Sequence, residues 1–477
     1  LLRKGNLSRD LEKRVIMMNP KSQTINLFPA VFVFLLLCAQ PSQATKDSSK
    51  GQVKLQNHRV GSSVIFPVSG NVYPLGYYYV LLNIGNPPKL FDLDIDTGSD
   101  LTWVQCDAPC NGCTKPRDSQ YKPNHNTLPC SHLLCSGLDL PQSKPCDDPE
   151  DQCDYEIGYS DHASSVGALV SDEFPLRLEN GSTMHPHLTF GCGYDQQSPG
   201  PHPPPPTAGI LGLGRGKVSI SSQLSSLGVT KNVIVHCLSH NGKGGFLSIG
   251  DELVPSSGVT WTSLSLKPPS KNYKTGPAEL LFDEKATGVK GVNFVFDSGS
   301  SYTYFNAEAY RAVLDLVRKD LKGKALKDTK EDKSLPVCWK DKKGLKSVHD
   351  VKKYFKTISL RFGGSQKNGQ VFQIPPESYL IITEKGNVCL GILNGTEIGL
   401  ENYNIIGDIS FQGIMVIYDN EKQRIGWIPS DCDKLPNVDQ DNGGDLSEEE
   451  AYPRGFGLIG ELFTGTDASK NKKDGEL

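Results

Sequence analysis

The chain has 477 residues, and its 50 Lys and Arg against 54 Asp and Glu leave a formal net charge of −4. This length exceeds what one hydrophobic core usually holds, so two lobes or domains are expected. A mildly acidic chain without a long basic tract gives no electrostatic reason to bind nucleic acid. The 48 Gly and 32 Pro, with few long apolar helical patterns, favour an all-β or mainly β protein with many turns.

The beginning of the chain has the pattern of a secretory signal. Met17 or Met18 is the candidate start, and an apolar run from Leu27 to Ala39 follows it. Small residues at Ser42-Gln43-Ala44 then suit cleavage by a signal peptidase. The apolar run is shorter than the ~20 residues that span a bilayer, so a membrane anchor is the weaker alternative. No other stretch is long enough to cross, and no membrane span is expected.

Thirteen cysteines are present, and removal of the signal with Cys38 leaves twelve. An even number behind a signal peptide implies a disulfide framework in an oxidising compartment, so a secreted or vacuolar protein is expected. Cys106, Cys110 and Cys113 are spaced like metal ligands. No second ligand pair with a suitable His follows them, so disulfides are favoured over a metal, and no cofactor is expected.

The first half of the mature chain begins with two strands. Tyr77 to Ile84 is rich in β-forming residues and is followed by a turn. Apolar residues then alternate from Phe91 to Ile95, which indicates a buried strand, and the chain runs into Asp96-Thr97-Gly98-Ser99. Gly98 lets the backbone bend tightly. The pattern therefore delivers a carboxylate, Asp96, from inside a sheet.

A cysteine-rich insert follows, from Cys106 to Cys153, and its weak apolar periodicity means that it must depend on its bridges. The residues from Tyr155 to Leu169 alternate around a polar turn, which predicts a β-hairpin. A stiff Pro-rich loop, Ser198 to Thr207, precedes the apolar Ile210-Leu211-Gly212.

The Asp turn returns 201 residues later as Asp297-Ser298-Gly299-Ser300, again after an apolar strand. Ile405-Ile406-Gly407 repeats Ile210-Leu211-Gly212 at a similar distance from its Asp. This internal repeat supports two homologous lobes. Two copies of one device place two Asp side chains at a pseudo-twofold axis.

Three further elements complete the second half. An amphipathic helix is predicted over Asn306 to Lys324, and a closing hairpin over Met415 to Trp427. From Asp433 the composition becomes acidic and polar, which indicates a flexible tail. The helix is expected to bury the apolar residues of one face: Ala309, Val313, Leu314, Val317 and Leu321.

The two Asp motifs, each after an apolar strand and each with an aromatic residue close behind, resemble the pepsin-like aspartic proteases. The cysteine-rich first half resembles the plant nucellin-like and nepenthesin-like branch. The resemblance covers roughly Gly76 to Cys432. It implies a bilobal pepsin-like acid protease fold with a few short helices, and an acid-active aspartic endopeptidase that cuts protein or peptide substrates as a monomer.

The resemblance also implies the roles of individual residues. Asp96 and Asp297 are the catalytic pair, and Tyr159 belongs to a flap over the cleft and hydrogen-bonds toward Trp103. His162 and Ala163 stand at the tip of this flap where Gly is common in the family, so the resemblance does not extend to the mobility of the flap or to its subsite preference. The support of the catalytic loops falls to Thr97, Gly98, Ser99, Ser298, Gly299 and Ser300.

Spacing alone leaves the disulfide connectivity open. The resemblance implies six bridges: Cys106 with Cys110, Cys113 with Cys192, Cys130 with Cys153, Cys135 with Cys146, Cys237 with Cys432, and Cys338 with Cys389. It further implies that basic residues between Lys46 and Gly70 pair with the catalytic carboxylates in a zymogen. An unstructured leader remains an equal alternative.

Two carboxylates placed close together cannot easily both be charged, so such a pair shares one proton and can activate a water between its members. A catalytically silent binding or inhibitor protein on the same fold is the rival hypothesis. Silent relatives typically lose an Asp or the hydroxyls that orient it, and both motifs here are intact. A third hypothesis, a disulfide-rich structural module, leaves the twin turns unexplained.

Asn180 and Asn394 begin Asn-X-Ser/Thr motifs and are predicted glycan acceptors. The expected domain organisation is a signal peptide over 17–44, a short prosegment or leader over 45–72, an N-terminal β lobe over 73–257, a C-terminal β lobe over 258–432, and a flexible acidic tail over 433–477.

Overall fold

The computed structural model describes residues 62–138, 146–198, 206–240, 242–265, 271–363, 369–401 and 404–434. The predicted signal peptide and most of the predicted leader and acidic tail lie outside these ranges. Within them the protein is mainly β, as expected, and no helix combines the length and apolarity needed to cross a bilayer. The three α-helices of these ranges are α1 (Ile220–Ser226), α2 (Ala307–Leu321) and α3 (Asp408–Phe411).

One large sheet runs through the described part of the chain. In spatial order its thirteen strands are β13 (Thr260–Ser263), β27 (Arg424–Pro429), β26 (Ile414–Asp419), β11 (Val233–Leu238), β12 (Gly245–Ile249), β1 (Val64–Asn71), β2 (Tyr77–Ile84), β3 (Lys89–Asp96), β10 (Gly209–Gly212), β4 (Trp103–Gln105), β9 (His187–Gln197), β6 (Ser164–Glu173) and β5 (Asp154–Gly158).

Four smaller sheets accompany it. Their strands, again in spatial order, are β15 (Lys285–Val292), β14 (Ala278–Phe282), β20 (Ile358–Phe362) and β21 (Gln370–Ile374); β16 (Phe294–Phe296), β25 (Asn404–Ile406), β17 (Thr303–Phe305) and β24 (Ile392–Asn394); β18 (Lys327–Thr329), β19 (Cys338–Lys340), β23 (Val388–Leu390) and β22 (Leu380–Ile382); and the pair β7 (Leu176–Arg177) and β8 (Thr183–Met184).

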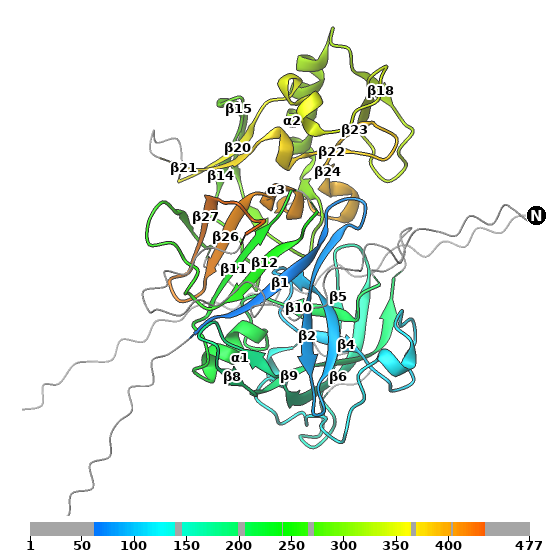
Figure 1. The fold of residues 1–477 in the computed structure, drawn as a ribbon, viewed down its shortest axis with the longest axis vertical. Helices are drawn as coiled ribbons and strands as arrows, with labels where there is room; N and C mark the ends of the chain where they lie inside the picture. Colours follow the sequence, from blue (N-terminus) through cyan, green and yellow to red (C-terminus); the bar gives the residue numbers. More distant parts are fainter. Residues whose placement is uncertain are drawn as a thin grey trace, which may run out of the picture. The chain divides into compact units, whose positions relative to one another are not determined.

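The large sheet joins the two halves of the sequence. The predicted closing hairpin is present as β26 and β27, and β26 pairs antiparallel with β11 of the first half. Figure 1 shows these two orange strands beside the green strands β11 and β12. The C-terminal strands of the described residues therefore share main-chain hydrogen bonds with the first half of the chain.

The predicted leader, 45–72, overlaps a strand of the large sheet. Residues 64–71, which were assigned to it, form β1, and this strand pairs with β12 on one side and β2 on the other. Val64, Phe66 and Val68 alternate into the core because side chains on a strand point to opposite faces in turn. A leader that ends at residue 72 would remove a central strand of the sheet.

Each Asp strand has a parallel partner, as the internal repeat predicts. β3 pairs with β10, where Leu211 lies opposite Ile95, and β16 pairs with β25, where Ile405 lies opposite Val295. The glycine that ends each partner motif, Gly212 or Gly407, passes close to the backbone that follows the Asp turn. A Cβ at Gly212 would lie 2.4 Å from the Asp100 carbonyl oxygen, so no larger residue fits there.

Helix α2 confirms the predicted amphipathic helix. The Asn306 side chain caps its first turn by accepting from the Ala309 N–H at 3.0 Å. Figure 1 shows α2 near the yellow strands β22 to β24, which belong to the second half of the sequence. The five apolar residues expected on the buried face, Ala309, Val313, Leu314, Val317 and Leu321, are the ones that the helix buries.

The disulfides agree with the prediction in part. Cys237 bonds Cys432 and Cys338 bonds Cys389, as the resemblance implied. The other eight cysteines pair differently, so four implied bridges, Cys106–Cys110, Cys113–Cys192, Cys130–Cys153 and Cys135–Cys146, are corrected. The observed bridges are Cys106–Cys192, Cys110–Cys113, Cys130–Cys146 and Cys135–Cys153.

Strand pairing explains the first correction. β4 and β9 run parallel with Val104 opposite Cys192, and Cys106 follows β4 directly, so its Cα lies 5.2 Å from that of Cys192. Cys110 and Cys113 then close their own loop. In the second group the Cys135 Sγ also lies 3.7 Å from the Cys146 Sγ, although Cys135 bonds Cys153. Because these sulfur atoms lie so close together, the spacing of the cysteines in the sequence does not determine which of them bond.

Candidate active site

The first Asp turn holds its carboxyl group with hydrogen bonds from its own backbone and side chains. Asp96 is the last residue of β3, whose Phe91, Leu93 and Ile95 are buried as the alternation predicts. The Gly98 N–H donates to Asp96 Oδ1 at 2.7 Å, and the Ser99 hydroxyl donates to Oδ2. Donors on both oxygens fix the orientation of the carboxyl group.

The second Asp turn repeats this geometry at the end of β16. The Gly299 N–H donates to Asp297 Oδ1 at 2.9 Å, and the Ser300 hydroxyl donates to Oδ2 at 2.8 Å. The two turns therefore hold their carboxyl groups by equivalent atoms, in agreement with the repeat of the sequence.

The two carboxyl groups lie side by side. A Cβ built on Gly98 would fall 2.5 Å from Asp297 Oδ1, and one on Gly299 would fall 2.4 Å from Asp96 Oδ1. Each glycine is thus required because its turn passes directly over the opposite carboxyl group. Asp96 and Asp297 also hydrogen-bond one another through their side chains.

Reciprocal hydrogen bonds lock the two turns together. The Thr97 N–H donates to Ser298 Oγ at 3.1 Å, and the Ser298 N–H donates to Thr97 Oγ1 at 2.9 Å. Each hydroxyl then donates to the strand that leads into the other turn, Thr97 to the Phe296 carbonyl and Ser298 to the Ile95 carbonyl. Both side chains are buried, so these bonds have no water to replace them.

Burial and mutual repulsion disfavour two charges in this pair. Burial raises the pKa of Asp96. Burial together with the negative charge of Asp96 raises the pKa of Asp297 to about 7. Two carboxyl groups in contact cannot both ionise cheaply, so the pair retains one proton over a broad acidic range.

The predicted hairpin is present as β5 and β6, and it reaches the first turn through Tyr159. The Trp103 indole N–H donates to the Tyr159 hydroxyl at 2.7 Å. Burial and the nearby charge of Asp96 raise the pKa of Tyr159 well above its ordinary value, so the hydroxyl stays protonated. Its proton is therefore available for a second hydrogen bond.

The tip of the hairpin has an unusual backbone conformation. His162 adopts a φ of +69°, in the left-handed region that Gly occupies most easily. The Tyr159 N–H donates to the Ala163 carbonyl, and the Ala163 N–H donates to the Asp161 side chain at 3.0 Å. These bonds hold a short turn closed, which explains how the sequence does without glycine there.

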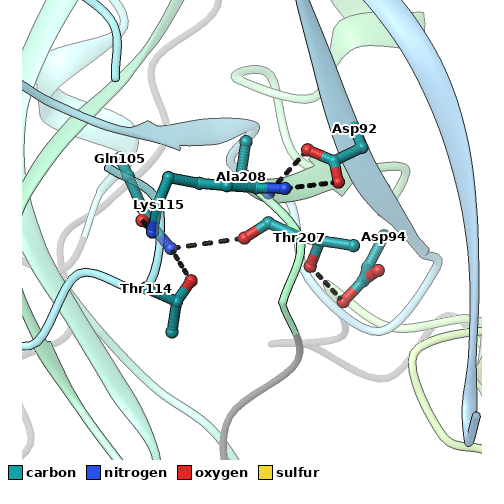
Figure 2. Close-up of polar contacts among 7 residues, drawn as sticks. All are labelled: Asp92, Asp94, Gln105, Thr114, Lys115, Thr207 and Ala208. Atoms are coloured by element: carbon teal, nitrogen blue, oxygen red, sulfur yellow. Dashed lines mark hydrogen bonds and ion pairs between the residues drawn. The ribbon is translucent and has the colours of Figure 1, made fainter. Parts of the chain in front are cut away.

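Sequence reasoning did not single out Asp94, which shares a strand face with Asp96. Figure 2 shows Asp92 and Asp94 of β3 directed at Ala208 and Thr207, with Lys115 beside them. Asp92 accepts from Lys115 at 2.7 Å and from the Ala208 N–H, while Asp94 accepts from the Thr207 hydroxyl at 3.1 Å. Burial raises the pKa of Asp94 to about 8.

A second acid was also missed. Asp408 begins α3 directly after Gly407 and is fully buried. Burial, and next the charge of Asp297, raise its pKa well above the ordinary value, which favours its neutral form. The signal that could have found it is its place after the Ile-Ile-Gly motif, because that motif passes beside the second Asp turn.

In the described part of the chain, two groups of side chains come close enough together to ligate a metal, and both contain cysteines. One group is Cys130, Cys135 and Cys146, and the other combines Asp332 with Cys338 and Cys389. All five cysteines belong to disulfides, so none offers the thiolate that a metal needs.

Paired Asp turns linked across two halves of a mainly β chain define a pepsin-like protein. Family models agree: the N-terminal xylanase inhibitor model matches residues 78–251 and the C-terminal xylanase inhibitor model matches residues 275–429. Among curated relatives, an aspartic proteinase of Oryza sativa subsp. japonica is 45% identical over 386 residues, which cover 79% of this chain and 92% of the relative.

"Aspartic proteinase nepenthesin-2" of Nepenthes gracilis is 28% identical, over 75% of this chain and 78% of its own. The chain belongs to the plant pepsin-like aspartic protease family. Solved structures share the fold: the basic 7S globulin from soybean superposes with a TM-score of 0.61 at 18% identity, over 79% of this chain and 99% of that one. Conglutin gamma from lupine seeds gives 0.60 at 17%, over 80% and 100%.

Proposed function

We propose that the protein is an acid-active aspartic endopeptidase that hydrolyses peptide bonds with a water held between Asp96 and Asp297. The observation that carries this proposal is the contact between the two carboxyl groups, each oriented by a Gly N–H and a Ser hydroxyl. Aspartic proteases are the standard example of two carboxyl groups sharing one proton. The intact turns supply both members of such a pair.

In this proposal Asp96 is the general base and Asp297 carries the shared proton. The charge of Asp96 raises the pKa of Asp297, while the hydrogen bond from Asp297 favours the ionised form of Asp96. Asp96 takes a proton from the water as its oxygen attacks the carbonyl carbon of the substrate. Asp297 donates its proton to the carbonyl oxygen, which gives a tetrahedral gem-diol intermediate. As the C–N bond breaks, Asp96 passes the proton from the water to the leaving amine and Asp297 takes back a proton from a hydroxyl of the intermediate, which restores the pair. No acyl-enzyme is formed.

The β5–β6 hairpin is the proposed flap over the substrate. Tyr159 is the residue that links it to the site, because its hydroxyl accepts from Trp103 and its pKa responds to the charge of Asp96. The substrate class is an extended peptide. A preference for apolar residues on both sides of the cut is an expectation from the family, not from named pocket residues.

A catalytically silent binding protein is the second candidate. It is favoured by the names of relatives: the matching family models are named for xylanase inhibitors, and the solved neighbours above are named as globulins. Against it, both Asp residues and all four supporting hydroxyls of Thr97, Ser298, Ser99 and Ser300 are present and hydrogen-bonded.

Peptide cleavage by the purified chain decides between the two. Cleavage is measured from about pH 3 to about pH 7, with and without a statine-type transition-state analogue. The wild type is compared with Asp96→Asn and with Asp92→Asn, a matched substitution on the same strand whose carboxyl group is held by Lys115. The proposal requires cleavage that the analogue and Asp96→Asn abolish and that Asp92→Asn keeps. Cleavage that neither the analogue nor Asp96→Asn reduces, or no cleavage at all, favours the binding protein.

Six disulfides among the described residues agree with an oxidising compartment, and we propose secretion or delivery to the vacuole as a glycoprotein. Asn180 is the more accessible of the two predicted acceptors. It is exposed in a turn, whereas Asn394 is half-buried and donates to Glu397 at 3.1 Å. The protein is proposed to act as a monomer.

A further inference from the structure

Asp94 is an acid beside the aspartate pair that the proposed chemistry does not use. It lies two residues before Asp96 on β3. Side chains on a strand alternate between its faces, so residues 94 and 96 point to the same side, about 7 Å apart along the strand. Phe91, Leu93 and Ile95 point to the opposite side and are buried. A further carboxyl group therefore lies next to the pair on the face that carries Asp96.

Strand pairing continues this face across the large sheet. Asp94 lies opposite Tyr79 of β2 on one side and opposite Ile210 of β10 on the other. Ile210 in turn lies opposite Trp103 of β4. Residues paired across neighbouring strands point to the same face, so these four side chains form one row. Tyr79, Asp94 and Ile210 are half-buried, so part of the row is open to solvent.

The row connects the aspartate pair with the proposed flap. Trp103, at one end of the row, donates to the Tyr159 hydroxyl of the flap at 2.7 Å. The next row along the sheet contains Asp96, which lies opposite Gly212. A peptide held between the aspartate pair and the flap would therefore place one of its side chains over the row that contains Asp94.

The carboxyl group of Asp94 has no cation within ion-pair distance among the described residues. Its Oδ2 accepts from the Thr207 hydroxyl at 3.1 Å, as Figure 2 shows, and its buried Oδ1 has no hydrogen-bond partner among these residues. Asp92 on the same face differs, because it forms an ion pair with Lys115 at 2.7 Å. An unpaired acceptor is costly, so a donor that reaches Asp94 is stabilised there without breaking an existing ion pair.

We propose that Asp94 forms the base of a substrate subsite that takes a basic side chain, Lys or Arg, next to the scissile bond. This inference rests on the proposed endopeptidase function and specifies its substrate class. At this one subsite it departs from the apolar preference expected from the family. Tyr79 and Ile210 flank the carboxyl group and offer packing for the methylene groups of a long basic side chain, whose charged end reaches Asp94.

The charge of this subsite depends on pH. Burial, and next the charges of Asp92 and Asp96, raise the pKa of Asp94 to about 8, so its free carboxyl group is neutral in acid. A cation beside it favours the ionised form. The preference for a basic side chain should therefore be weak at low pH and grow as pH rises. The other charged or titratable groups that face Asp94 are Lys115, Tyr77 and Tyr79 of β2, and Asp408 of α3.

Paired peptides test the subsite. At each position next to the scissile bond, one peptide carries Lys and its partner carries norleucine, which keeps the four side-chain carbons of Lys and lacks the amine. At one of these positions the wild type should prefer Lys in kcat/KM by about twofold or less near pH 4 and about tenfold near pH 6.5, because hydrogen bonds between charged groups are the stronger ones. In Asp94→Asn the ratio should stay within about twofold at both pH values, because the amide carries no charge.

Asp172→Asn is the matched control. Asp172 is half-buried on β6, four strands from β3 in the same sheet, and its carboxyl group accepts from the Tyr121 hydroxyl and the Asn126 amide. This variant should keep the wild-type preference at both pH values. A wild-type ratio that does not rise with pH overturns the inference. So does a rise that persists in Asp94→Asn, or one that is lost equally in Asp172→Asn.

Binding of an uncleaved peptide decides the inference without turnover. A statine-type analogue with Lys at the same position should release up to about one proton more on binding near pH 6 than its norleucine counterpart, because the Asp94 carboxyl group ionises beside the amine and gives its proton to the buffer. Calorimetry in two buffers of different ionisation enthalpy counts this proton, and Asp94→Asn should not release it.

The binding measurement separates this inference from the proposed function. A wild type that binds the Lys analogue with this proton release but cleaves nothing would end the proposed endopeptidase function and keep the subsite. A wild type that cleaves both peptides of every pair equally well at both pH values would keep the endopeptidase and overturn the subsite. Binding of neither analogue, or equal proton release with both, also overturns it.

Discussion

The two Asp turns hold their own carboxyl groups in the same way but differ in the residues that surround them. Each holds its carboxyl group with a Gly N–H and a Ser hydroxyl. The strand that leads into Asp96 also carries Asp92 and Asp94, whereas the strand that leads into Asp297 is the apolar Phe294–Phe296. Near the first turn, Trp103 also donates a hydrogen bond to Tyr159 of the flap.

The difference shows what the internal repeat does and does not require. Symmetry is kept where the two carboxyl groups meet, since both must be held by the same kind of donors. It is lost further out, where Asp92 and Asp94 lie on the strand before the first turn and Trp103, after that turn, contacts the flap. Substitutions can test each layer separately.

The largest effect is expected in the inner layer. Asp96→Asn and Asp297→Asn should each lower kcat by about a thousandfold or more, because general acid and general base catalysis are each worth ~10²–10⁴. Equal losses are expected, since neither residue can do the work of both. Steady-state kinetics on one peptide measures kcat for each variant, and circular dichroism checks that each variant is folded. A loss confined to one of the two variants would break the symmetry of the inner layer.

The acids on the Asp96 strand should make stability depend on pH. The folded pKa of Asp94, about 8, lies above its unfolded value of about 4, so its protonated form stabilises the fold fully below about pH 4. This contribution is lost as pH rises through the folded pKa. Asp94→Asn cannot ionise and should therefore lose less stability between about pH 4 and about pH 8, by on the order of a few kcal/mol.

Denaturant unfolding of the wild type and Asp94→Asn at both pH values gives that difference. Groups that titrate in both proteins, His236 included, cancel in the comparison. Parallel pH curves for the two proteins would mean that Asp94 is already ionised in the fold at low pH.

The cross-turn bonds offer a direct comparison of the two sides. Thr97→Ala leaves the Ser298 N–H without its acceptor, and Ser298→Ala leaves the Thr97 N–H without one. Each unpaired buried group costs about 1–3 kcal/mol, so both variants should be destabilised by about that amount and by similar amounts. Thr97→Ser keeps the hydroxyl and serves as the control. Clearly unequal unfolding free energies for the two Ala variants would contradict an equivalent role of the two hydroxyls.

The smallest effect is expected at the flap. Tyr159→Phe leaves the Trp103 N–H without its acceptor but keeps the ring. Loss of one neutral hydrogen bond is worth about 1 kcal/mol, so kcat/KM should fall roughly fivefold. Trp103→Phe removes the donor of the same hydrogen bond. The variant that carries both substitutions should therefore lose about as much kcat/KM as either single variant. Additive losses would mean that the two side chains act separately.

Much of the inner layer could be predicted from sequence. Alternation before Asp96, the repeated Asp turn and the repeated Ile/Leu-Gly motif are local patterns, and local patterns specify strands and turns. Thr97 and Ser298 were assigned to the support of the loops, and the structure shows them bonded across the seam. Helix α2 was predictable for the same reason, because its period and its Asn cap are both local.

The disulfides and the leader show where local patterns end. Cys130, Cys135 and Cys146 bring their sulfur atoms within bonding reach of one another, so spacing is compatible with more than one pairing. The predicted leader covers β1 because the partner of that strand, β12, lies far along the chain and leaves no mark in the neighbouring sequence. Both depend on contacts between distant residues.

The sequence by itself determined that two carboxylates emerge from buried strands, that each is held by its own Gly and Ser, and that the chain is mainly β. Only the tertiary structure decided that the two carboxyl groups touch, and that the half-buried Asp94 and the fully buried Asp408 lie in electrostatic reach of them. A turn is set by neighbouring residues, whereas the burial of a side chain and its pKa are set by whatever distant strands pack against it.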